Sequence, residues 1–338
     1  MPDFFALSAE DRREALAVAA DASGRPIHLL EKDVWVVWAL QALFGSALGE
    51  HLVFKGGTSL SKGYGVIRRF SEDVDLTYDI REIAGDLIGE SKSILPSSKS
   101  QGKRWTDEIR ERLPKLVSDK IAPQLAESLR SQGLSAKVSA VDDKLFLEYE
   151  ALVPGYGYVK PIVALEFGAR STGEPSEPRD VVCDAAKYLP TVAFISARPQ
   201  VMRPERTFWE KATAIHVYCH KGEFRGGDRF ARHWHDLSHL DAAGYAESAI
   251  NDKDLAKDVA DYKSVFFAEK DHSGAAIDYH QAVNGSLLLL PREGALAALA
   301  EDYEGMVNDG LLMDEAAPFE KLMEDCKAIQ DRANARGK

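Results

Sequence analysis

The sequence predicts an α+β protein in which strands and helices alternate in the first part and helices follow in the second. Three observations lead to this prediction. An apolar run at 53–54 and an alternating stretch at 73–76 indicate strands separated by a helical segment. Alternating stretches at 136–150 and 160–170 indicate a hairpin and a further strand. From Pro204 onward, apolar residues recur at helical spacing.

The first amphipathic helix is expected over residues 27–44. Leu30, Val34 and Val37 recur there at roughly helical spacing. The sequence Glu31-Lys32-Asp33 falls within this helix, and we interpret it as a solvated face on which opposite charges pair.

Two glycines and two hydroxyl residues begin a second expected helix. Gly56 and Gly57 let the backbone approach a ligand closely because they have no side chain. Thr58 and Ser59 follow at the helix start, where backbone N–H groups point outward and the helix dipole favours an anion. The pattern indicates a phosphate site, and the competing interpretation is a plain helix entry.

Two aspartates alternate with apolar residues after this helix. Because side chains alternate across a strand, Asp73 and Asp75 should lie on one face while Val74 and Leu76 enter the core. Two carboxylates held close together either raise a pKa or bind a hard cation, and oxygen ligands suit Mg²⁺. The combination of the glycine turn and this pair indicates metal-assisted phosphoryl or nucleotidyl transfer.

The middle of the chain is expected to contain helices and a hairpin. Residues 80–89 read as a helix, and a longer helical stretch from 105 to 131 is expected to kink or break at its two internal prolines. The stretches 136–140 and 145–150 are expected to pair as a hairpin.

A further carboxylate lies near the end of an apolar strand. Ile162, Ala164 and Glu166 share one face because side chains repeat every second residue. A nearly buried carboxylate is costly unless it is paired or bound to a metal. Both options stay open for Glu166: a metal ligand, or an ion pair with Arg170.

The helix expected over residues 205–220 carries Lys211 among apolar neighbours. Such a lysine is most often a surface residue whose aliphatic stem covers apolar atoms while its ammonium group reaches water. The functional alternative is a cation that grips a triphosphate. Spacing alone favours the surface residue.

The next expected helix carries a polar stripe. Arg229, Arg232, His233 and Asp236 fall at positions i, i+3, i+4 and i+7, hence on one face. On spacing alone, we interpret this stripe as facing solvent.

Composition restricts the class of protein. The 338 residues are 45% hydrophobic, enough for a sizeable core, and we expect two domains, 1–195 and 196–338. No apolar run approaches the roughly 18 residues of a membrane span, and the N-terminus lacks the basic region of a secretion signal. We therefore expect a cytoplasmic protein with no membrane partner.

Charge and metal-binding residues exclude further classes. The formal net charge of −12 disfavours a protein that coats long nucleic acid, but allows one that binds an RNA end through a local basic patch. Three distant cysteines argue against a disulfide framework. Zinc is disfavoured because the histidines with helical spacing have no cysteine or acidic partner in a zinc pattern; these are His216 with His220 and His235 with His239.

The order Gly-Gly-Thr, helix, Asp-x-Asp resembles the signature of the polymerase β nucleotidyltransferase superfamily. The segments KGGTSLSKGY at 55–64 and RFSEDVDL at 69–76 resemble more closely the AbiEii/AbiGii toxin family, the nucleotidyltransferase-like toxins of bacterial toxin–antitoxin and phage-abortive systems. The segments at 31–33, 207–214 and 229–237 are also similar to that family. One departure is the spacing between Thr58 and Asp73, slightly longer than in the superfamily, which an extra helical turn would accommodate.

The resemblance implies a polymerase β-like nucleotidyltransferase core, a mixed sheet with flanking helices, followed by a C-terminal helical domain that completes the active-site cleft. It implies that Glu166 is the third acidic metal ligand, or else that Asp236 assists the metal or activates the acceptor hydroxyl. The implied catalytic residues are Asp73, Asp75, Lys211, Asp236 and Glu166; the implied metal ligands are Asp73, Asp75 and Glu166; the implied nucleotide-binding residues are Gly56, Gly57, Thr58, Ser59, Lys211, Arg232 and, more weakly, Arg229.

The resemblance also implies a function. The chain would be an Mg²⁺-dependent toxin of a type IV-like system, with Mn²⁺ as the alternative metal, that transfers NMP from NTP to a cellular acceptor, with a tRNA 3′ end suggested. A cognate antitoxin encoded alongside would be its partner. Two alternatives stay open: nucleotidylation of a protein or small molecule, and a nucleotide-binding regulator without catalysis. The preferred nucleotide, the acceptor and the antitoxin cannot be read from these residues.

Overall fold

The computed structural model describes residues 1–70, 73–89, 94–154, 160–222, 229–308, 312 and 316–336. By its internal contacts the chain divides into two compact units. The last boundary between the two units along the chain lies between Met202 and Arg203. Unit 1 comprises Met1–Gly63, Glu72–Gly89 and Asp107–Met202, and unit 2 comprises Tyr64–Ser71, Glu90–Thr106 and Arg203–Lys338.

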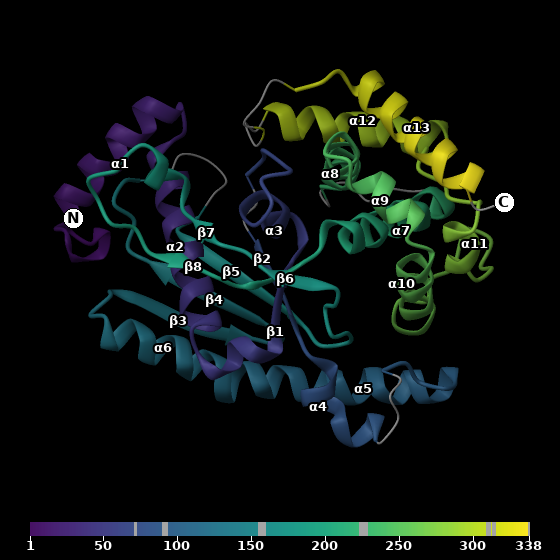
Figure 1. Cartoon of the computed structure of the whole chain (residues 1–338), viewed down its shortest axis with the longest axis horizontal. Coiled ribbons are helices and arrows are strands. Elements are labelled where there is room, and N and C mark those ends of the chain that lie inside the picture. Colours follow the sequence, from purple (N-terminus) through teal and green to yellow (C-terminus); the bar gives the residue numbers. More distant parts are fainter. Residues whose placement is uncertain are drawn as a thin grey trace. The chain divides into compact units, whose positions relative to one another are not determined.

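Unit 1 is built on a mixed sheet, and its strands other than β9 are labelled in Figure 1. In chain order they are β1 (Leu52–Lys55), β2 (Asp73–Tyr78), β3 (Ala136–Val141), β4 (Lys144–Tyr149), β5 (Ile162–Gly168), β6 (Ser176–Pro178) and β9 (Gln200–Met202). Across the sheet the order is β3-β4-β5-β2-β1-β9-β6. The pairs β2–β5 and β1–β9 are parallel, and the other neighbours are antiparallel. The predicted α+β class with a mixed sheet is confirmed.

Helices surround this sheet. They are α1 (Ala9–Ser23), α2 (Ile27–Phe44), α3 (Gly56–Lys62), α4 (Ile80–Ile88), α6 (Ala122–Ser131) and the second half of α5 (Lys99–Leu116). Helical turns at Phe4–Ala6, Ala47–His51 and Asp184–Lys187 and a small sheet of β7 (Val181–Val182) and β8 (Ser196–Ala197) complete the unit. Helix α2 packs against β5, β8 and α6.

Helix α2 is buried on nearly all sides, so the predicted solvated face of Glu31-Lys32-Asp33 is wrong. The three residues are only 3–4% exposed. Glu31 accepts the backbone N–H of Leu152 at 3.1 Å, and burial raises the pKa of Glu31 to about 7. The apolar residues that follow the trio occupy every side of the helix, which is typical of a helix enclosed by the protein.

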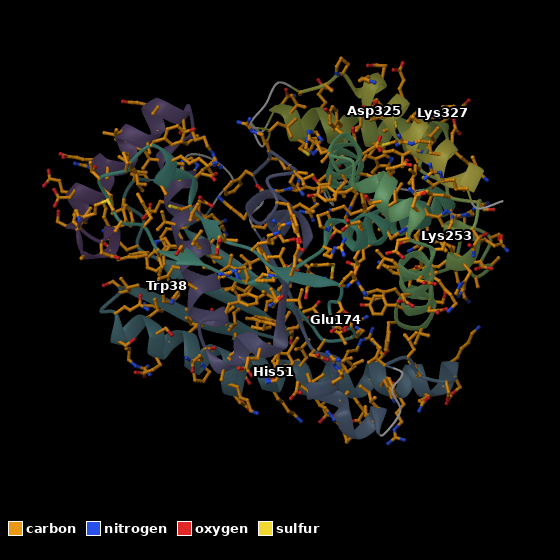
Figure 2. The ribbon with its side chains drawn as sticks, in the orientation of Figure 1. Trp38, His51, Glu174, Lys253, Asp325 and Lys327 are labelled. Atoms are coloured by element: carbon orange, nitrogen blue, oxygen red, sulfur yellow. The ribbon has the colours of Figure 1, made fainter. Side chains whose placement is uncertain are left out.

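Tryptophans of α2 anchor it in the core. Trp38, labelled in Figure 2, is fully buried, and its indole Nε1 donates to Gln132 Oε1 at 2.9 Å. Trp35 stacks on Tyr149 of β4 with ring centroids 5.3 Å apart. These contacts bury large aromatic surfaces while satisfying the indole N–H, as stable cores require.

The long helix changes its hydrogen-bond pattern just before one of its two prolines. Helix α5 continues through Pro114 to Leu116, and a π-type turn at Val117–Ile121 then leads into α6, which has Pro123 in its first turn. Pro123 has no N–H to donate back to the preceding turn, so the regular hydrogen-bond ladder is interrupted there.

The predicted β3–β4 hairpin is confirmed. The strands pair antiparallel from Ala136↔Tyr149 to Val141↔Lys144, and Asp142 takes a positive φ of 53° in the turn. Leu145 is completely buried, whereas Phe146 on the other face is half-buried. The two faces of this strand therefore differ in burial.

Unit 2 consists of helices in the part that follows Arg203, as predicted. They are α7 (Pro204–Lys221), α8 (Ala231–Ala242), α9 (Tyr245–Asn251), α10 (Lys253–Phe266), α11 (Tyr279–Val283), α12 (Glu293–Asn308) and α13 (Phe319–Arg336). Helix α7 packs against α8, α9 and α10, and both α12 and α13 pack against α8. Among the described residues, no helix combines the length and apolar character needed to cross a membrane.

Candidate active site

Strand β2 presents two carboxylates on one face. Asp73 and Asp75 are half-buried, whereas Val74 and Leu76 between and after them are completely buried. The sequence alternation therefore predicted the two faces of this strand correctly.

A third carboxylate lies on the neighbouring strand. In the parallel pair of β2 and β5, Asp75 is opposite Glu166 and Asp73 is opposite Ala164. Residues in register on adjacent strands point to the same face of a sheet. Asp73, Asp75 and Glu166 therefore share one face.

Lys144 is a member of this group that the sequence did not reveal. It begins β4, lies opposite Glu166 in the antiparallel β4–β5 pair, and its Nζ forms an ion pair with Glu166 Oε1. The hydrogen bond to Glu166 raises the pKa of Lys144, and the Asp73 carboxylate adds to the effect. Glu166 thus has a lysine partner from the adjacent strand, where the sequence suggested Arg170.

Gly56 lies against the Asp75 carboxylate. Strand β1 ends at Lys55, which is opposite Asp75, and the backbone turns into α3 at Gly56 with φ +78°. A Cβ atom added at Gly56 would lie 2.1 Å from Asp75 Oδ2. A side chain would occupy the space of the carboxylate, so the turn needs glycine both for its φ and for this contact.

The hydroxyl groups of Thr58 and Ser59 donate within the protein. Both residues are buried, at 3% and 0% exposure. Thr58 Oγ1 donates to the backbone oxygen of Asp73 at 2.5 Å, and Ser59 Oγ donates to the backbone oxygen of Gly56 at 2.9 Å. The two hydroxyls hold α3 against β2 and shape the turn that precedes it.

The acidic face fits a cation held mainly by two carboxylates. Within the described residues, no three His, Cys, Asp or Glu side chains gather closely enough to hold a metal ion. Mg²⁺ commonly takes only one or two carboxylates and completes its shell with water and substrate phosphates. Asp73 and Asp75, with Gly56 leaving room beside Asp75, fit that pattern.

Unit 2 contains a buried charge cluster centred on Asp236 of α8. Asp236 is completely buried. The Arg69 guanidinium donates to both carboxylate oxygens at 2.7 Å, and the Lys211 ammonium lies 2.8 Å from Oδ2. Burial alone would raise the pKa of Asp236, but the cations of Arg69 and Lys211 hold it well below its usual range.

This cluster corrects two interpretations based on spacing. Lys211 is 8% exposed and paired with Asp236, so it is not a surface lysine. Arg69 lies 167 residues before Asp236 and had no assigned role. Its position between apolar and aromatic residues, at Ile67 and Phe70, was the one local signal that its side chain could be enclosed.

The predicted polar stripe on α8 is wrong in two respects. The helix begins at Ala231, so Arg229 precedes it and takes a positive φ of 49°. The face is also not solvated: Arg232 and His233 are half-buried and Asp236 is enclosed. Burial and the cations of Lys211 and Arg232 hold the pKa of His233 well below its usual value, so its ring is neutral near pH 7.

Replacing Asp236 with alanine is expected to lower the free energy of unfolding by about 3–5 kcal/mol, because two buried cations lose their shared partner. Denaturant unfolding of the full chain measures this loss. The matched control is Asp241→Ala on the same helix, where Asp241 pairs with a partly exposed Arg332 at 2.5 Å. That pair should contribute no more than about 1 kcal/mol. Equal losses in the two variants would show that the cluster is not coupled as described.

Known proteins are similar to this chain over most of its length. The family model described as nucleotidyl transferase AbiEii toxin, type IV TA system, matches residues 38–325. Among solved structures, the chain is similar to MenT4, a nucleotidyltransferase toxin from Mycobacterium tuberculosis H37Rv, at 18% sequence identity, with 95% of this chain and 98% of that chain covered and a TM-score of 0.41. No curated protein sequence matches the chain.

Proposed function

We propose that this chain uses Mg²⁺ to transfer NMP from an NTP to the 3′ end of a tRNA. The premise is that the chain belongs to the AbiEii family of nucleotidyltransferase toxins of type IV toxin–antitoxin systems. Membership of this family implies nucleotidyltransferase activity and a cognate antitoxin. The proposal concerns the metal, the acceptor and the roles of individual residues. We propose the cytoplasm as the location of this reaction, because both proposed substrates are found there.

The observation that supports this proposal most directly is the acidic face of β2. Asp73 and Asp75 point to the same side, and Gly56 lets the turn into α3 approach Asp75 closely. Asp73 and Asp75 would hold Mg²⁺, which when bound would stabilise negative charge on the phosphates. We propose that backbone N–H groups at the start of α3 donate to the phosphates, because the hydroxyls of Thr58 and Ser59 already donate to backbone oxygens of the protein.

Between Glu166 and Asp236, Glu166 is the better candidate for the acidic residue that activates the acceptor hydroxyl. It lies opposite Asp75 on the adjacent strand and is half-buried. Asp236 is enclosed, and both its oxygens are held by cations. A general base must reach the proton it removes and have a pKa near the working pH, and Asp236 satisfies neither condition.

Two cationic side chains of unit 2 are proposed to bind the nucleotide. We propose that Asp236 orients Lys211, and that Lys211 and Arg232 interact with phosphate groups. Arg229 is retained as a weaker candidate in the segment before α8. Arg69 holds the other side of Asp236 and is a positioning residue in this proposal.

Labelling with each of the four NTPs tests the proposed reaction. The purified chain is incubated with Mg²⁺, one labelled NTP and either total RNA or protein extract. We expect one nucleotide to label the tRNA fraction at a site that 3′-end sequencing locates. Label in protein or in a small molecule would support the first alternative. Calorimetric binding of NTP without any labelled product would support a non-catalytic regulator.

A further inference from the structure

A buried charge network joins the end of α3 to α2 and to the turn at Asp184. Lys62 is the last residue of α3, and its Nζ contacts Asp33 Oδ1 and lies 2.8 Å from Asp184 Oδ1. The side chains of Lys62 and Asp33 are 10% and 5% exposed. Asp33 Oδ2 also accepts the backbone N–H of Asp184 at 2.6 Å, and Arg25 forms an ion pair with Asp184.

This network holds one ammonium group between two carboxylates. Burial alone would lower the pKa of Lys62, but Asp33 and Asp184 raise it, so the ammonium stays charged. Buried ion pairs add little net stability over apolar packing, because desolvation offsets most of their attraction. They do fix geometry, since an ammonium leaving this position would leave Asp33 without a cationic partner and Asp184 with Arg25 alone.

The geometry fixed here is that of α3. The helix has seven residues, about two turns, which is too short to be stable alone, so its contacts determine its position. At its start, Thr58 is bonded to the backbone of β2, and Gly56 packs on Asp75. At its end, Lys62 is tied to α2 and to the Asp184 turn.

We propose that Lys62, held by Asp33 and Asp184, positions the Gly56–Gly57 turn beside the carboxylates of β2 and thereby supports binding of NTP phosphates. This inference rests on the proposed function. Lys62 acts through α3 as a positioning residue, because its ammonium group is already engaged by the two carboxylates.

The test compares Lys62→Met with Lys62→Arg in the full chain. Calorimetry measures the affinity for each Mg²⁺–NTP in turn. We expect Lys62→Met to weaken binding at least about tenfold, equivalent to about 1.4 kcal/mol. Lys62→Arg keeps the cation and should bind within about threefold of the original chain, a loss below 1 kcal/mol.

The matched control is Lys115→Met. Lys115 forms an ion pair with Glu111 at 2.7 Å, but the two side chains are 65% and 70% exposed. The substitution is the same, and the pair lost is a solvated one that contributes little. NTP affinity should therefore stay unchanged in this variant.

Hydrogen exchange separates positioning from general destabilisation. In Lys62→Met, amides of 53–63 should exchange faster while those of α6 keep their rates, at a temperature well below the unfolding midpoint. If Lys62→Met does not fold, Asp33→Asn/Lys62→Met replaces it, because that variant removes the stranded charge while Arg25 still pairs with Asp184.

The outcomes distinguish this inference from the proposed function. A folded Lys62→Met or double variant that binds NTP like the original chain overturns the inference and leaves the labelling result standing. Faster exchange throughout unit 1, with no selective effect at 53–63, also overturns it. If the original chain neither binds nor transfers any NTP, the proposed function fails first and the inference falls with it.

Discussion

Replacing Asp73 with asparagine is expected to abolish nucleotide transfer and growth inhibition while the chain stays folded. The substitution keeps the size of the side chain on β2 and removes one of the two carboxylates proposed to hold Mg²⁺. Loss of one preorganised electrostatic group typically costs about 10²–10³-fold in rate, so transfer should fall by at least about 100-fold. The labelling assay measures the rate, and growth after induced expression measures toxicity.

Asp142→Asn is the matched control for this change. Asp142 is exposed in the β3–β4 turn with a φ of 53°, a conformation that asparagine also adopts readily. It should transfer nucleotide and inhibit growth like the original chain. Circular dichroism and the thermal midpoint check that both variants are folded. A fully toxic Asp73→Asn variant would mean that catalysis does not depend on this carboxylate.

Local periodicity predicted the features that depend on neighbouring residues. The alternation at 73–76 placed two aspartates on one face, and the stretches at 136–140 and 145–150 predicted the hairpin. The pairing of Lys144 with Glu166 depends on how β4 and β5 align, which no local pattern specifies. The contact between Arg69 and Asp236 likewise joins segments that are distant in the chain.

The spacing of residues along a helix does not reveal which charged side chains are buried. Charged residues are rarely enclosed without partners, so spacing alone favours solvent exposure for Glu31-Lys32-Asp33 and for Lys211. Each proved to be enclosed with partners supplied from other elements: Asp33 by Lys62 of α3, and Lys211 by Asp236 of α8. For Lys211, the family resemblance pointed to a special role where spacing did not. Such clusters become predictable only when the tertiary partners are known.

Gly56→Ala is expected to remove most transfer activity through a steric effect on Asp75. The added Cβ would lie 2.1 Å from Oδ2 and 2.9 Å from Cγ of Asp75, so the carboxylate or the turn must shift. A displacement of about 1 Å at a reacting centre can cost about 10²-fold in rate. We therefore expect a loss of about 100-fold, measured in the same labelling assay with saturating NTP and Mg²⁺.

Gly133→Ala separates this steric effect from backbone strain. Gly133 follows α6 with φ +65°, close to the +78° of Gly56, but a Cβ there would meet nothing within 4 Å. Both substitutions carry the cost of alanine at positive φ, roughly 1–2 kcal/mol. Only Gly56→Ala displaces a proposed metal ligand. The two variants should therefore lose similar amounts of stability, but only Gly56→Ala should also lose most of its transfer activity. Similar activities in the two variants would show that the contact between Gly56 and Asp75 has no part in the reaction.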